Sequence, residues 1–96
     1  MDAFMVICTF KPGTVMDEVF AVVAEEQAQV AALEAEGRIG SIELSLARGT
    51  VFIKVFAEGA EAAADTVRSL PMSKWWDLDL FPVAAPAAPA APGAAS

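Results

Sequence analysis

Residues 39–57, IGSIELSLARGTVFIKVFA, contain two runs of alternating apolar and polar side chains around a short turn. The runs cover residues 39–46 and 50–57, and the turn is Ala47-Arg48-Gly49. A period of two is the period of a β-strand, so this stretch predicts an antiparallel hairpin. In the first strand Ile42, Leu44 and Leu46 share one face, and Ser41, Glu43 and Ser45 share the other.

Four further elements flank this hairpin. Residues 4–10, FMVICTF, predict a central strand that is apolar on both faces. A helix is expected over residues 15–36, with Thr14 as its N-cap and Gly37 after its last turn. A short helix over residues 60–70 stops at Pro71, and residues 75–83 predict an edge strand. The order β-α-β-β-α-β predicts an α+β, ferredoxin-like fold with an antiparallel sheet.

Composition narrows the possible functions. The chain has 96 residues, a net charge of −7, one cysteine and no histidine. The acidic balance argues against nucleic-acid and membrane-surface partners. The lack of histidine excludes His-based metal sites and His-containing catalytic groups, so we expect no metal and no cofactor. Without a targeting or membrane-spanning segment, the sequence predicts a cytoplasmic protein.

The chain divides into one folded domain, residues 1–83, and a Pro/Ala-rich tail, residues 84–96, expected to be extended or disordered. In the domain, several predicted strands carry apolar residues on both sides, whereas two helices cover only one face of the sheet. A second copy is the simplest cover for the other face. The sequence therefore predicts a homo-oligomer in which two sheets form a dimeric α/β barrel.

Glu26 is the leading catalytic candidate. At about 100° per residue, it falls in the middle of the apolar stripe of the predicted helix, one turn after Val22 and one turn before Val30. A carboxylate on a buried stripe is costly unless it is paired or protonated. Glu26 is thus interpreted as a general base or acid, or else as a helix-edge residue paired with Lys54 or an arginine.

Other candidates lie on the hairpin and the last strand. Lys54, between Phe52 and Phe56, would hold an anionic substrate or an oxyanion, or else pair with Glu43 across the hairpin. Glu43 faces solvent, a cavity or a partner subunit. The adjacent Trp75 and Trp76 point to opposite faces, so that one packs in the core and the other lines a pocket or interface. The candidate substrate-binding residues are Glu43, Phe52, Trp75 and Trp76.

Residues 65–83, DTVRSLPMSKWWDLDLFPV, resemble the C-terminal part of muconolactone Δ-isomerases, in which a Leu-Pro pair precedes an aromatic-Asp strand. The segment from Ala24-Glu25-Glu26 to Glu36-Gly37 also resembles that family's first helix. The resemblance implies a homo-oligomer of ferredoxin-like subunits, a small pocket between the sheets or at the subunit boundary, and cofactor-free proton transfer on a lactone. It also places a family acidic residue at Glu26.

The first strand departs from that family. Met5 and Ile7 stand near the positions of an inward histidine and lysine, so we expect a less polar substrate, or loss of the isomerase activity. The predicted reaction is a double-bond isomerisation in which Glu26 moves a proton and Lys54 stabilises an enolate-like intermediate. The alternatives are a cofactor-free oxygenase or cyclase of polyketide-like aromatics, and a non-catalytic oligomeric binding or accessory protein.

Overall fold

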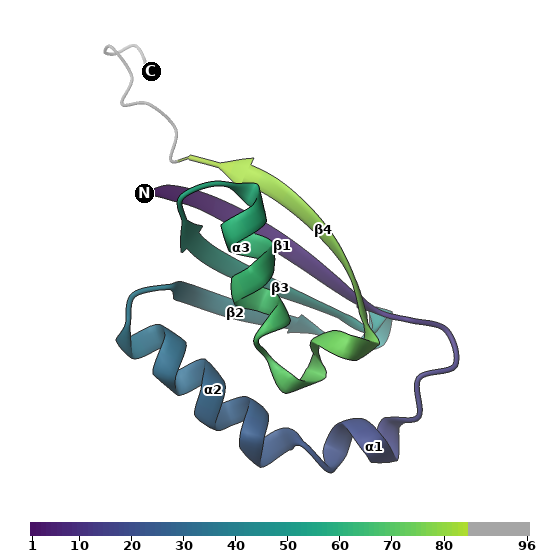
Figure 1. Cartoon of the computed structure of the whole chain (residues 1–96). Coiled ribbons are helices and arrows are strands. Elements are labelled where there is room, and N and C mark those ends of the chain that lie inside the picture. The colour runs from purple at the N-terminus through teal and green to yellow at the C-terminus, as the bar shows by residue number, and fades with distance from the viewer. Residues whose placement is uncertain (85–96) are drawn as a thin grey trace, which may run out of the picture.

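The computed structural model describes residues 1–84 as an α+β domain with one four-stranded antiparallel sheet (Figure 1). The strands lie in the order β2-β3-β1-β4, which places β1 and β3 in the centre. This arrangement is compatible with the predicted ferredoxin-like fold. In chain order the elements are β1 (Asp2–Phe10), α1 (Met16–Phe20), α2 (Val23–Ala35), β2 (Ile39–Ser45), β3 (Thr50–Ala57), α3 (Ala60–Arg68) and β4 (Trp76–Val83), with short 3₁₀ turns η1 (Leu46–Arg48) and η2 (Pro71–Trp75).

All three helices lie on one side of the sheet, with α3 across β1 and β3 and α2 beside it (Figure 1). Alternate residues of the central strands point toward these helices and form the core. Val6, Cys8 and Val55 are fully buried there, and Val67 of α3 and Leu33 of α2 pack against the same cluster. The alternation that predicted the strands therefore also separates the two faces of the sheet.

The helix predicted over residues 15–36 is divided. α1 ends at Phe20, and Val22 leaves the helical region with φ −109° and ψ 12° before α2 begins. Val19 of α1 is buried, as are Glu26 and Leu33 of α2, so both helices contribute buried side chains to the domain. The predicted N-cap is also wrong, because the Thr14 hydroxyl donates to the Lys11 carbonyl instead.

Other boundaries agree closely with the sequence-based expectations. α2 ends where Gly37, at φ 73°, allows the Arg38 N–H to reach the Leu33 carbonyl at 2.9 Å. β3 has the predicted bounds, and β4 is an edge strand as expected. A register shift between Ile39 and Ile42 interrupts the predicted strict alternation in β2.

The expected tail falls almost wholly on residues 85–96, which lie outside the described part of the chain. Within residues 1–84, no helix is long and apolar enough to span a membrane.

Candidate functional site

A cavity of about 640 Å³ lies between α1, α2 and one end of the sheet. Its walls are mostly apolar side chains, including Val19, Val30, Ile53 and Trp76. Phe20 of α1 and Leu44 and Leu46 at the end of the hairpin also line the cavity, although each is largely exposed to solvent. These exposed apolar residues form its mouth.

Glu26 projects from α2 into this apolar environment. Only 9 % of its surface is exposed, whereas its sequence neighbour Glu25 is exposed to solvent. The Oε1 atom accepts a hydrogen bond of 2.9 Å from the Met72 backbone N–H. Within residues 1–84, no lysine or arginine forms a salt bridge with Glu26. The carboxyl group is therefore held by one neutral donor rather than by an opposite charge.

The η2 turn supplies that donor. Leu70, which is almost fully buried, anchors the chain, and Pro71 begins the turn that carries Met72 over the cavity. The Leu-Pro pair thus positions a main-chain N–H 46 residues away from its acceptor along the chain. Sequence reasoning missed Met72 because a backbone donor leaves no side-chain signal.

Burial raises the pKa of two groups in this region. Desolvation raises the pKa of Glu26 above its ordinary value, and the Met72 hydrogen bond opposes part of that rise. Cys8, fully buried on β1, has its pKa raised to about 12, first by burial and second by the nearby Glu26 carboxylate. The thiol is therefore a protonated part of the core.

The two tryptophans lie in different environments, but Trp76 takes both of the roles that were divided between them in the prediction. Trp76 is 4 % exposed, lines the cavity and makes an edge-to-face contact with Phe10 at 6.1 Å between ring centroids. Its Nε1–H is buried and has no acceptor within residues 1–84. Trp75 ends η2 and is only partly buried, and the Lys74 Nζ atom lies 4.6 Å from its ring centroid. Only Trp76 belongs to the cavity wall.

The remaining predicted site residues are not brought to Glu26. Lys54 and Phe52 alternate with the buried residues of β3, and therefore lie on the sheet face opposite the helices, together with Glu43, which pairs with Phe52. The Lys54 Nζ atom lies 5.9 Å from the centroid of the Phe56 ring, and no ion pair between Lys54 and Glu43 forms within residues 1–84. Within one subunit, the sheet therefore lies between Lys54 and the cavity.

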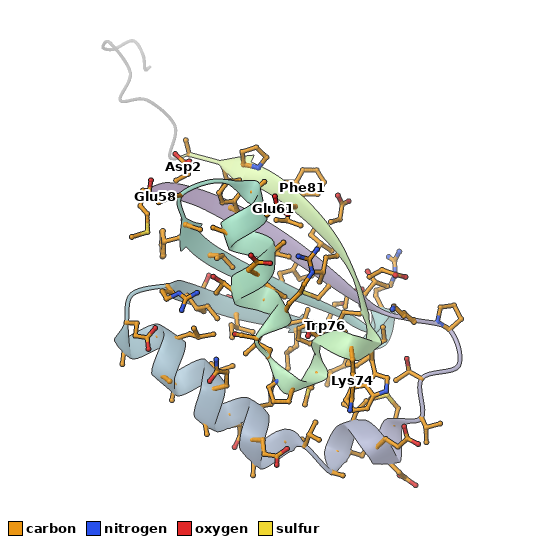
Figure 2. The ribbon with its side chains drawn as sticks, viewed as in Figure 1. Asp2, Glu58, Glu61, Lys74, Trp76 and Phe81 are labelled. Atoms are coloured by element: carbon orange, nitrogen blue, oxygen red, sulfur yellow. The ribbon has the colours of Figure 1, made fainter. Side chains whose placement is uncertain are left out.

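A second, polar pocket lies on the other side of Trp76. It is lined by Lys11, Arg68 and Lys74, which come from three separate segments, and also by Asp77. Figure 2 shows Lys74 and Trp76 together at the start of β4. The basic side chains of this region therefore lie outside the cavity that contains Glu26.

The described residues contain no group of three or more metal-ligating side chains. Comparison of the chain with models of protein families and with curated protein sequences gave no match.

Proposed function

We propose that the protein catalyses a cofactor-free proton transfer on a cyclic, unsaturated carbonyl compound, as the resemblance to muconolactone isomerases implies. The observation that carries this proposal is the carboxyl group of Glu26, buried against an apolar cavity and held by a single backbone hydrogen bond. A general base in such a setting binds a proton more strongly than an exposed glutamate does.

The two carboxylate oxygens of Glu26 have different roles in this proposal. Oε1 is held by the Met72 N–H, and Oε2 has no hydrogen-bond partner among residues 1–84. Oε2 would take a proton from the carbon next to the substrate carbonyl, and the C–H electron pair would enter the conjugated system as an enolate. Glu26 would then deliver a proton to the far carbon of that system, either the one it removed or one exchanged with solvent, so that the double bond moves and the substrate keeps its composition.

The enolate step does not include Lys54, because its side chain lies on the opposite face of the sheet. We propose for this face a different role, which is contact with a second copy in a dimeric α/β barrel. Its support is a row of apolar side chains, Met5, Ile7, Phe52 and Phe56, that no helix of residues 1–84 covers. The ferredoxin-like fold and a cytoplasmic location complete this proposal.

Proton NMR in D₂O tests the chemistry directly. Wild type is incubated with muconolactone and with a panel of less polar butenolides, and deuterium exchange and double-bond migration are followed. Glu26→Gln should slow both by about 10²–10⁴-fold, the usual contribution of a general base.

Glu25→Gln is the matched control, because Glu25 is the exposed neighbour on the same helix. It should retain the wild-type rate. A loss of only a few-fold in Glu26→Gln, or an equal loss in both variants, would remove Glu26 from the mechanism.

The size and apolar lining of the cavity also favour a second candidate, a cofactor-free oxygenase or cyclase of polyketide-like aromatics. Oxygen uptake with aromatic substrates separates an oxygenase from an isomerase. Ligand binding without turnover in either assay would instead indicate a non-catalytic binding protein.

A further inference from the structure

We infer that the ligand of the Glu26 cavity is a neutral, mainly apolar molecule of drug-like size, and that the cavity rejects anions. This inference rests on the proposed function in one respect, since it takes the cavity to be the substrate site. It differs from the lactone acid of the resembled family in both charge and size.

The distribution of positive charge indicates that the ligand is not an anion. All six lysines and arginines of the chain lie within the described residues, and none of them lines the cavity. Lys11, Arg68 and Lys74 line the second pocket, and Lys54 lies on the opposite sheet face.

The two remaining cations are also outside the cavity. Arg38 contacts the Glu36 carboxylate and the Thr66 hydroxyl. Arg48 is exposed in the turn at the mouth and is not part of the wall.

The ionisable groups that do line the cavity are both acidic. They are Glu26 and Glu34. An anionic ligand would lose its hydration without gaining an opposite charge, and the Glu26 carboxylate would repel it. A neutral ligand avoids both costs.

The volume of the cavity and the residues at its mouth indicate the size and the apolar character of the ligand. A cavity of about 640 Å³ falls within the range of pockets that bury a drug-sized molecule, and is larger than a single five-membered ring needs. Phe20 is 63 % exposed and Leu46 is 86 % exposed, so two large apolar side chains that line the cavity are also open to solvent. A ligand that extends from Glu26 to this mouth would cover both.

Two dyes with one skeleton test this inference. N-phenyl-1-naphthylamine is neutral, and 1-anilinonaphthalene-8-sulfonate adds a sulfonate to the same ring system. Titrations of wild type followed by dye fluorescence should give a Kd for the neutral dye that is at least about tenfold lower, since tenfold corresponds to about 1.4 kcal/mol. Equal or tighter binding of the sulfonate would overturn the inference.

Variants locate the dye. Phe20→Ser and Leu46→Ser should each weaken binding of the neutral dye about three- to tenfold, because each removes apolar contact area at the mouth. Phe81→Ser is the control, because Phe81 is exposed but lies near the other end of β4 from Trp76 (Figure 2). An equal loss in Phe81→Ser would place the dye on the open face of the sheet and contradict the inference.

Two further measurements distinguish a failure of the proposed function from a failure of the inferred ligand class. Glu26→Gln should retain the neutral dye and bind the sulfonate more tightly than wild type does, whether or not the protein shows turnover. Dye binding without isomerisation would refute the proposed function but not the ligand class. If Phe20→Ser lowers the sedimenting mass and leaves dye binding unchanged, the mouth is a contact between copies and the inference is wrong.

Discussion

The carboxyl group of Glu26 holds its proton more strongly in the folded chain than in the unfolded chain, because burial raises its pKa above 4.5. Between the unfolded and the folded pKa, the native protein retains a proton that the unfolded chain has already released. The contribution of Glu26 to the free energy of unfolding is therefore largest below pH 4.5. It falls as the pH rises through the folded pKa and is then constant.

Glu26→Gln removes this titration while the amide oxygen can still accept the Met72 hydrogen bond. In urea unfolding between pH 4 and 8, the variant should gain stability relative to wild type as the pH rises. Taking the difference between the two proteins cancels the other acidic groups. A stability difference that does not change with pH would show that Glu26 titrates normally.

The residue scale also shows what the sequence can and cannot reveal about the site. Helical periodicity around Val22 and Val30 was enough to predict that Glu26 is buried, and the structure confirms it. The position of Lys54 between Phe52 and Phe56 predicts a role in the same mechanism, but strand alternation shows which residues share a face and not which face meets the helices. The Met72 amide and the open mouth at Phe20 depend on tertiary packing, which no local pattern records.

Among the three α-helices, α1 is the least anchored. It has five residues, no side-chain cap, and Val19 as its one buried side chain, whereas α3 buries four residues against the sheet. Short helices depend on tertiary packing for their stability. Hydrogen exchange should therefore be fastest in α1 and slowest in β1 and β3, with α3 closer to the central strands. Protection of α1 equal to that of α3 would contradict this order.

The division between α1 and α2 also explains why the predicted helix was too long. Residues 15–36 contain no proline or glycine, so local propensity gives no reason to stop at Phe20. Val19 and Glu26 are seven residues apart and would lie on one face of a straight helix, so the apolar pattern gives no sign of the break at Val22 either. β3 was predicted correctly because its alternation and its burial pattern coincide.

At the scale of the whole molecule, the uncovered sheet face predicts association. An isologous dimer through this face should sediment at about twice the 10.0 kDa chain mass. Phe52→Asp places an extra negative charge opposite Glu43 and in the middle of the apolar row, and it should shift the protein to monomer.

Phe20→Asp is the matched control, because it adds the same charge on the helix side of the sheet. It should leave the mass of the assembly unchanged. Circular dichroism of both variants should match wild type, since neither side chain belongs to the buried core. A wild-type protein that is monomeric at micromolar concentration would rule out the dimeric barrel.

The position of Cys8 makes its alkylation a measure of how often the folded core opens. The thiolate is the form that reacts with alkylating reagents, and a fully buried thiol with a pKa raised to about 12 offers almost none of it. Cys8 lies on a central strand, between Val51 of β3 and Leu78 of β4, and its side chain belongs to the core under the helices. The rate at which iodoacetamide alkylates this single cysteine therefore reports how often the packing between the sheet and the helices opens.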